Sequence, residues 1–226
     1  MEVVLLAGGM GTRLHSVVSD LPKPMAPVNN KPFLEYIFQW IAKYPVSSVI
    51  LSVGYKSEAI SNYFGDYFQN IPLKYVKDAK PLGTGGAIVY ALKAAADSDV
   101  IIINADTYFP VDINELVNFH KLKEAKLTVA LKTMKAFDRY GTVELIGDTI
   151  SRFNEKQFCE EGLINGGIYV VNKEFVNSMS LPEVFSFEKE ILEKQADSGA
   201  LKGLVFTEPF IDIGIPEDYY RASEIV

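Results

Sequence analysis

The sequence predicts an α/β fold with a mostly parallel central sheet and a β-rich second half. In residues 1–125 short apolar runs alternate with segments of helical spacing, whereas residues 126–226 hold closely spaced β-forming runs. Glycine-rich turns follow the first and third apolar runs. Parallel neighbours need long crossover connections, which helices supply on both faces of a sheet. We therefore expect a single domain, residues 1–226, built as a Rossmann-like three-layer sandwich with halves at about 1–125 and 126–226.

The first half supplies the expected parallel strands and the helices between them. The expected strands lie at residues 3–6, 49–53, 73–76 and 100–103. Apolar residues within 34–41 recur at i, i+3, i+4 and i+7, which is one face of a helix. Segments 60–64 and 87–95 follow the same spacing. Asp112 with Glu115 is a capping-box pattern, which predicts a further helix ending near residue 123.

The second half is rich in β-forming residues and ends in a helix. The expected strands lie at residues 127–131, 142–145, 149–153 and 168–171. Gly147-Asp148 is a turn signal between two of them. Pro216 predicts a helix start, and the acids at 217 and 218 would stand near the positive end of its dipole.

Composition narrows the classes of function. The 226 residues are 48% hydrophobic and 23% charged, as is usual for a globular protein. A net charge of −7 argues against nucleic acid as the main partner, because binding the phosphate backbone needs a positive surface. No apolar run has the length of a membrane span, the first residues lack the basic region of a signal peptide, and Cys159 has no internal disulfide partner. We expect a cytoplasmic protein that binds neither membrane nor nucleic acid.

The first glycine-rich turn is suited to an anion. Residues 6–14 read LAGGMGTRL directly after the first expected strand. Glycines let successive backbone N–H groups approach a phosphate, and Arg13 adds a cation with several donors. The segment is neither a GxxxxGK[ST] loop nor a complete GxGxxG fingerprint. The alternative is a tight strand-to-helix turn without a ligand.

Two further elements in the same half are candidates for ligand binding. Lys23 lies between Pro22 and Pro24, which stiffen the chain around its ammonium group, although a solvated surface lysine is the alternative. Residues 81–87 read PLGTGGA after the third expected strand. A base or ribose could lie against such a backbone, and an ordinary helix-entry loop is the alternative.

Carboxylates at two positions could hold a metal ion. Asp106 follows the expected strand 100–103 and so points to the edge where open α/β sheets bind ligands, unless it caps the next turn. Asp212 lies in an apolar segment, where a charge needs either an ion-pair partner or a cation. Oxygen ligands of this kind suit Mg²⁺.

Other chemistry-bearing residues give weaker signals. Glu155-Lys156 is typical of a solvated pair. His15, His120 and Cys159 lack zinc-ligand spacing, and no G-x-S-x-G motif is present. The aromatic stripe around Trp40 is typical of a buried core, although an exposed stripe would suit a homodimer.

Taken in order, these motifs resemble the sugar-1-phosphate nucleotidyltransferase family over nearly the whole chain. The segments that carry the resemblance are 6–14, 22–24, 81–87, 104–106, 155–156, 165–167 and Asp212. Segments 24–28 (PMAPV) and 211–219 (IDIGIPEDY) are most similar to the members that act on D-glycero-α-D-manno-heptose 1-phosphate and GTP. Ala105, Ile215 and Lys80 depart from the family pattern.

The resemblance implies a role for each motif. A nucleoside triphosphate and a sugar 1-phosphate would be the substrates, Mg²⁺ the cofactor, and the product a precursor of cell-surface polysaccharide. Arg13 and Lys23 would be catalytic, and Asp106 and Asp212 would hold the metal. The implied nucleotide-binding residues are Leu6, Ala7, Gly8, Gly9, Gly11, Thr12, Arg13, Leu82, Gly83, Thr84, Gly85 and Asp106. The implied sugar-binding residues are Asn104, Gly141, Glu155, Lys156, Asn165 and Gly166.

Rival functions remain open at this point. A mannose 1-phosphate guanylyltransferase, or a uridylyl-, cytidylyl- or thymidylyltransferase, would use the same chemistry. A module that senses a nucleotide or nucleotide sugar without turnover is the non-enzymatic alternative, although two metal carboxylates argue against it. A dehydrogenase is disfavoured by the incomplete glycine fingerprint.

Overall fold

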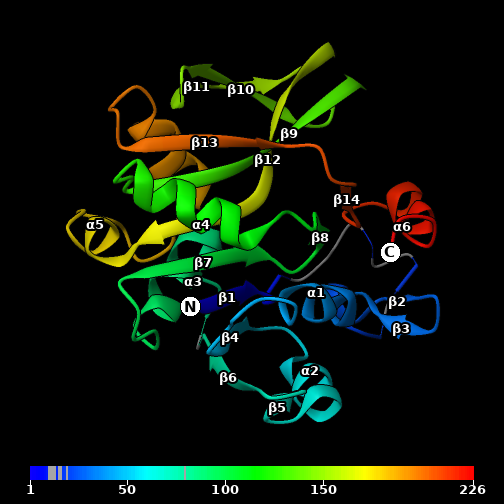
Figure 1. Cartoon of the computed structure of the whole chain (residues 1–226). Helices are drawn as coiled ribbons and strands as arrows, with labels where there is room; N and C mark the ends of the chain where they lie inside the picture. The colour runs from blue at the N-terminus through cyan, green and yellow to red at the C-terminus, as the bar shows by residue number, and fades with distance from the viewer. Residues whose placement is uncertain (10–13, 15–16, 19, 79) are drawn as a thin grey trace.

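The computed structural model describes residues 1–9, 14, 17–18, 20–78 and 80–226, and in these a ten-stranded sheet has helices on both faces (Figure 1). In spatial order the strands are β10 (Gly141–Ile146), β11 (Thr149–Lys156), β13 (Leu201–Phe206), β9 (Leu127–Phe137), β12 (Cys159–Asn172), β7 (Asp99–Asn104), β1 (Glu2–Leu6), β4 (Ser48–Val53), β6 (Ile71–Lys77) and β5 (Tyr67–Phe68). The predicted α/β sandwich is confirmed.

The four strands expected in the first half form a continuous parallel run within this sheet. β1 pairs in parallel with both β7 and β4, and β4 pairs in parallel with β6. The intervening helices are α1 (Phe33–Ile41), α2 (Ser57–Phe64) and α3 (Gly83–Leu92). All six residues of β4 are buried, as expected for a parallel strand with helices on both faces. The crossover units predicted from the apolar periodicity are therefore present.

Alternating residues of the strands supply two separate cores. In β1 the side chains of Val3 and Leu5 belong to one core and that of Val4 to the other. The first core packs against α1, α2 and α4 (Ile113–Leu122), and the second packs against α3, α5 (Lys173–Asn177) and the π-helix η3 (Glu188–Glu193). This is the three-layer arrangement, because a strand sends successive side chains to opposite faces.

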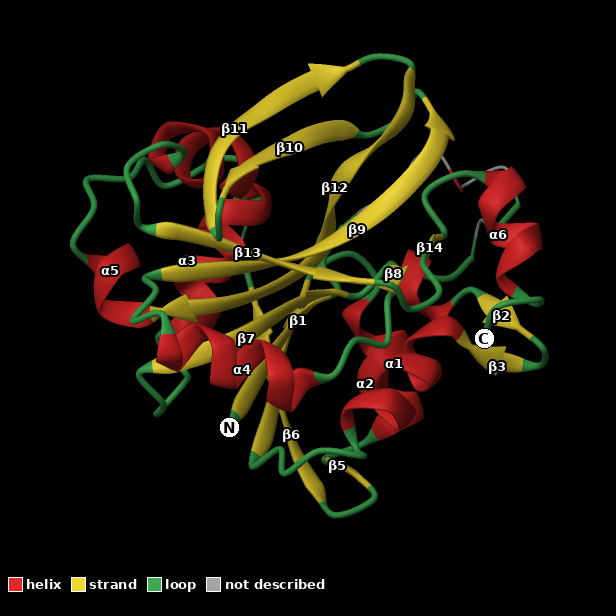
Figure 2. Cartoon of the chain, turned by 45° about the horizontal axis from the view of Figure 1, so that its top comes forward, coloured by secondary structure: helices red, strands yellow, loops and turns green. Residues whose placement is uncertain are grey.

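The second half extends the same sheet with strands that pair mainly in antiparallel fashion. β12 lies between β7 and β9 and runs antiparallel to both. Figure 2 shows β9 and β12 continuing past the helices to meet β10 and β11. The predicted turn between β10 and β11 is present, with Gly147 at φ +59°. β13 was not expected from the sequence, and it pairs in parallel with β9.

Two small ladders complete the edge at which the parallel strands end. β2 (Pro27–Val28) pairs with β3 (Lys31–Pro32), and β8 (Thr107–Tyr108) pairs with β14 (Ile211–Asp212). The terminal helix α6 (Pro216–Ala222) begins at the predicted proline and lies beside the β2–β3 ladder in both views (Figures 1 and 2). The last residues of the chain therefore reach the same edge as β2 and β3, which lie near its start.

Local signals in the helices behave as expected. The Asp112 side chain accepts hydrogen bonds from the backbone amides of Asn114 and Glu115 and so caps α4. Trp40 is only 2% exposed and donates from its indole nitrogen to the Val111 carbonyl at 3.1 Å. The aromatic stripe is thus core, and it gives no support to the expectation of a homodimer. In the described part of the chain, no helix is long and apolar enough to cross a membrane.

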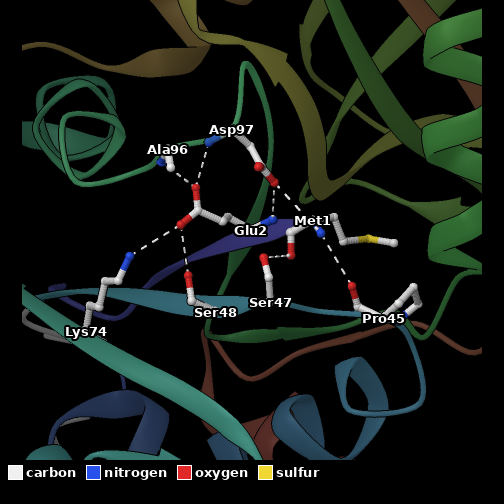
Figure 3. Close-up of polar contacts among 8 residues, drawn as sticks. All are labelled: Met1, Glu2, Pro45, Ser47, Ser48, Lys74, Ala96 and Asp97. Atoms are coloured by element: carbon white, nitrogen blue, oxygen red, sulfur yellow. Dashed lines mark hydrogen bonds and ion pairs between the residues drawn. The ribbon is translucent and has the colours of Figure 1, made fainter.

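A buried carboxylate organises the opposite edge, where the parallel strands begin (Figure 3). One oxygen of Glu2 accepts from the amides of Ala96 and Asp97, and the other accepts from the Ser48 hydroxyl and the Lys74 ammonium. Asp97 in turn accepts from the Glu2 amide at 2.8 Å. Burial opposes the charge of Glu2, but these donors outweigh it and hold its pKa below the usual range. This group, the Glu2 cluster, ties β1 to β4, β6 and the turn before β7.

Candidate active site

A cavity of about 570 Å³ lies at the carboxyl ends of the parallel strands. Open α/β sheets bind ligands at this edge, where neighbouring strands send their connections in opposite directions. Segments that follow β1, β4, β6 and β7 all contribute to the wall. The predicted site residues on this wall are Leu6, Ala7, Gly8, Gly9, Lys23, Leu82, Gly83, Thr84, Asn104 and Asp106.

The turn after β1 passes close to the turn after β4. The Ala7 amide donates to the Ser52 carbonyl at 2.8 Å, and a Cβ on Gly54 would stand 2.7 Å from the Gly8 carbonyl oxygen. Any side chain at Gly54 would therefore force the two turns apart. The remaining predicted members of that turn lie outside the described residues: Gly11, Thr12 and Arg13.

The second glycine turn is fixed by a segment far away in the sequence. The Phe185 amide donates to the Leu82 carbonyl, and the Gly85 amide donates to the Phe185 carbonyl, both at 3.0 Å. Gly83 has φ +72°, and a Cβ there would stand 2.4 Å from the same Phe185 carbonyl oxygen. Gly85 packs against the Phe185 ring and is not on the cavity wall, whereas Thr84 is on it.

Lys23 lies between the two carboxylates that the sequence singled out. Its ammonium nitrogen is 2.6 Å from Asp106 Oδ2 and 3.5 Å from Asp212 Oδ1. The Lys23 side chain is only 11% exposed, so it is not a solvated surface lysine. Lys23, Asp106 and Asp212 form one group, the Lys23 cluster, and two of its members line the cavity.

The β8–β14 ladder is what brings the two aspartates together. Asp212 pairs with Thr107, the residue after Asp106, and the Ile213 amide donates to the Asp106 carbonyl at 3.0 Å. The Gly214 amide donates to Asp212 Oδ1 at 2.7 Å and orients that carboxylate. The ladder joins residues more than a hundred positions apart, and no local pattern in the sequence predicts it.

The charges of the Lys23 cluster are only partly balanced. Burial, together with the negative charge of Asp106, raises the pKa of Asp212 above its usual range, although Lys23 acts in the opposite direction. The pKa of Asp212 is raised although Lys23 lies beside it, so the single ammonium group does not fully compensate the two carboxylates. A further cation would therefore bind favourably at this site.

The donor set of this cluster fits Mg²⁺. Two carboxylates already converge on a single cationic group, and both present the hard oxygen atoms that Mg²⁺ prefers. Within the described residues no group of three or more His, Cys, Asp and Glu side chains is arranged around a common metal position. This also suits Mg²⁺, which is usually bound through one or two carboxylates together with substrate phosphates and water.

Part of the expected sugar-binding set adjoins the cavity. Asn104 lines the wall, and a Cβ on Gly167 would stand 2.8 Å from the side-chain nitrogen Nδ2 of Asn104. The strand β12 is irregular at Asn165, whose side-chain oxygen accepts from the Gly167 amide at 2.9 Å. Gly166 leaves room for the Phe109 ring, which a Cβ would approach to 2.6 Å. Asn165 and Gly166 therefore lie on the bulge of β12 that packs beside Asn104.

The other three expected sugar-binding residues lie together on the β10–β11 pair. Gly141 pairs with Lys156, and a Cβ on Gly141 would stand 2.3 Å from the Asn154 carbonyl oxygen. Glu155 and Lys156 are exposed at the end of β11. None of these three is on the wall of the cavity described above.

Several residues on the wall were not predicted as site residues. Tyr55 follows β4, and Lys77, Asp78 and Lys80 lie at or after the end of β6. One carboxylate oxygen of Asp78 is buried without a hydrogen-bond partner within the described residues. The rule that ligands bind at the carboxyl edge would have identified these positions, because each follows a strand that the sequence predicts.

Comparisons with known proteins identify the family of this chain. The family model described as nucleotidyl transferase matches residues 2–226. D-glycero-α-D-manno-heptose 1-phosphate guanylyltransferases from Aneurinibacillus thermoaerophilus and Campylobacter jejuni are each 48% identical to this chain. The first alignment covers 99% of this chain and 97% of the relative, and the second covers 98% of both.

Solved structures give the same result. HddC from Yersinia pseudotuberculosis in complex with GMP-PN superimposes with a TM-score of 0.87 at 36% identity, covering 99% of this chain and 98% of that one. A UTP-bound UGPase from Acinetobacter baumannii has a TM-score of 0.84 at 18% identity, and the superposition covers 99% of this chain and 92% of that one. At this identity the likeness shows the shared fold alone. The match to the family model over nearly the whole chain, together with the full-length relatives, shows that this chain belongs to the nucleotidyl transferase family.

Proposed function

We propose that the protein transfers a guanylyl group from GTP to D-glycero-α-D-manno-heptose 1-phosphate and releases pyrophosphate. The observation that carries the chemistry is Lys23 between Asp106 and Asp212 at the cavity edge. The choice of substrates rests on the full-length relatives at 48% identity, which carry that name. The single free cysteine, Cys159, suits a reducing compartment, so we propose the cytoplasm as the location.

In the proposed reaction a phosphate oxygen of the sugar 1-phosphate attacks the α-phosphorus of GTP. The new oxygen–phosphorus bond forms as the bond to the β,γ-diphosphate breaks, and the diphosphate leaves as pyrophosphate. The second pKa of a phosphate monoester is about 6, so the nucleophile is already ionised at neutral pH and no general base is needed. The protein must therefore align the two substrates and neutralise their charge.

The residues of this chain divide that work. The backbone of Gly8 and Gly9 would approach the phosphates, and Leu82 to Thr84 would lie against the base. Asn104 and the bulge at Asn165 and Gly166 would bind the sugar 1-phosphate. Lys23 would neutralise charge on the reacting phosphates, and Arg13 would do the same within the first turn. Mg²⁺ held by Asp106 and Asp212 would add Lewis-acid stabilisation of the phosphate oxygens.

The decisive experiment is pyrophosphate release in the presence of Mg²⁺. GTP, CTP, UTP and dTTP would each be tested with D-glycero-α-D-manno-heptose 1-phosphate and with mannose 1-phosphate. Release with GTP and the heptose alone is the expected result. Release with another pair would contradict the substrates but keep the site. No release with any pair, from a folded protein that binds GTP, would instead favour a nucleotide-sensing module.

A further inference from the structure

The first turn of α6 contains a buried carboxylate, Asp218, whose ion pairs go beyond a favourable interaction with the helix dipole. Asp218 is 6% exposed and forms ion pairs with Arg139 and with Arg221, the latter at 3.3 Å. A favourable interaction with the helix N-terminus needs no burial, whereas a buried charge requires close partners. The two arginines differ in position, because the Arg221 side chain is 66% exposed and that of Arg139 is 35% exposed.

Arg139 belongs to the short segment 139–141, which connects β9 to β10 and includes the first residue of β10, and this segment packs toward the Lys23 cluster. The Arg139 guanidinium lies 5.6 Å from the centre of the Tyr140 ring, and that ring meets Phe210 edge-on at 5.8 Å. Phe210 lies two residues before Asp212. Burial, followed by the negative charge of Asp212, raises the pKa of Tyr140.

Helix α6 and its C-cap residue also contact the β2–β3 hairpin, which follows the short helix Lys23–Met25 in the chain. The Tyr219 hydroxyl donates to the Pro27 carbonyl at 2.6 Å, and the Asn29 amide donates to the Ser223 carbonyl at 3.1 Å. The helix begins four residues after Asp212. The helix therefore contacts the β2–β3 hairpin and lies shortly after Asp212 in the chain. Among the ion pairs of the described residues, the pair of Asp218 with Arg139 is the one that joins α6 to segment 139–141.

We propose that Asp218 is a positioning residue, whose ion pair with Arg139 holds segment 139–141 beside Asp212 and thereby sets the affinity for the sugar 1-phosphate. The inference rests on the proposed function and on the sugar contact that the family resemblance implies for Gly141, which lies outside the wall of the cavity described above. Gly141 is covalently next to Tyr140 and begins β10, so a shift of Arg139 displaces it directly. In the proposed function GTP contacts the turns after β1 and β6, which segment 139–141 does not form, so we expect nucleotide affinity not to depend on the pair.

The test compares Asp218→Asn, Arg139→Gln and Arg221→Gln. The last variant is the matched control, because it removes an arginine from the same carboxylate on the exposed side. Asp218→Asn and Arg139→Gln are expected to raise KM for the sugar 1-phosphate on the order of tenfold or more, with KM for GTP within about twofold of wild type. Arg221→Gln should leave both constants unchanged. Arg139→Lys, which keeps the charge, should recover part of the loss.

Two further measurements separate positioning from general damage. Protection of each variant against melting by GTP should match wild type, because that protection depends on the affinity for GTP, and a variant with a damaged nucleotide site would lose it. The double variant Asp218→Asn with Arg139→Gln should lose no more than the worse single variant, because the two residues act as one unit. If Asp218→Asn does not fold, Arg139→Gln provides the test, since that side chain is one-third exposed.

The outcomes separate a failure of this inference from a failure of the proposed function. An active wild type together with unchanged sugar 1-phosphate KM in Arg139→Gln would overturn the role of Asp218 and leave the proposed function intact. An equal rise in both KM values, or the same rise in Arg221→Gln, would overturn it as well. A wild type that turns over no substrate pair would overturn both.

Discussion

The two ends of the parallel strands each hold a cluster of carboxylate and ammonium groups, and the clusters are balanced in opposite ways. In the Glu2 cluster, a single carboxylate receives two backbone amides, a hydroxyl and Lys74, and its pKa is lowered. In the Lys23 cluster, two carboxylates share one ammonium, and the pKa of Asp212 is raised. The first arrangement stabilises the native charges and the second leaves negative charge in excess.

This difference separates a structural site from a functional one. A buried carboxylate whose hydrogen bonds are complete stabilises the fold, because folding provides donors that hold its charge. Like charges held close together reduce stability, and they are retained where a ligand or cation completes the site. We therefore expect substitutions in the Glu2 cluster to change stability with little effect on chemistry, and substitutions in the Lys23 cluster to do the reverse.

The largest effect is expected for Asp106→Ala and Asp212→Asn. Each removes a carboxylate that would hold Mg²⁺, and loss of one such stabilising group typically lowers turnover on the order of 10²–10³-fold. The melting temperature of Asp212→Asn should be no lower than that of wild type, because a raised pKa marks a charge that folding disfavours. Pyrophosphate release and thermal melting of the same preparations provide the measurement. Near-normal turnover in either variant would contradict the metal site.

Lys23→Ala should also lower turnover strongly and, in addition, change the response to metal. Without the ammonium, Asp106 and Asp212 face each other with their mutual repulsion uncompensated. Added Mg²⁺ or Mn²⁺, without nucleotide, should therefore raise the melting temperature of Lys23→Ala more than that of wild type. Lys74→Ala is the control, since it removes the ammonium of the other cluster. Equal metal responses in all three proteins would show that the two aspartates do not share a cation site.

The sequence predicts the members of a cluster where each has a local signal, but it does not predict contacts between residues that lie far apart in the chain. Lys23, Asp106 and Asp212 each have a local signal in the sequence: two flanking prolines, the end of an apolar strand, and an acid in an apolar segment, respectively. Their convergence on one point was not predicted from spacing, because it depends on the β8–β14 ladder. The family resemblance, and not periodicity, placed them together.

The Glu2 cluster shows the opposite case. From the sequence, Glu2 is only an acid near the start of the chain, and its four donors come from residues 48, 74, 96 and 97. Similarly, the sequence predicts the second glycine turn but not its partner Phe185, about one hundred residues later. Strands and helices follow from local periodicity. Contacts between distant turns depend on the completed sheet.

Within the Glu2 cluster, Glu2→Gln should lower stability but not turnover per folded molecule. Both oxygens of Glu2 accept hydrogen bonds, and glutamine replaces one of them with an NH₂ group, which cannot accept. A donor on that side loses its acceptor, and an unsatisfied buried donor typically costs about 1–3 kcal/mol of stability. Urea denaturation measures the loss. Glu58→Gln is the matched control, because its ion pair with Lys77 is exposed and contributes little. A wild-type midpoint for Glu2→Gln would show that these hydrogen bonds do not stabilise the fold.

The same carboxylate predicts a pH dependence. Because the pKa of Glu2 in the folded protein lies below its ordinary value of 4.5, its contribution is fully present above that pH and is lost as the pH falls below it. The difference in unfolding free energy between wild type and Glu2→Gln should therefore be constant near neutral pH and shrink below pH 4.5. A difference that grew on acidification would mean that folding raises this pKa.

The smallest effect is expected for Lys74→Ala. Lys74 is 3.4 Å from Glu2 and its side chain is 47% exposed, so solvent screens the pair and side-chain entropy opposes it. The two backbone amides and the Ser48 hydroxyl would still hold the charge of Glu2. The loss should stay below about 1 kcal/mol, and raising the salt concentration should reduce it further. A loss as large as that of Glu2→Gln would mean that the ammonium, and not the backbone amides, stabilises the carboxylate, and the Glu2 cluster would then resemble the Lys23 cluster in depending on a single cation.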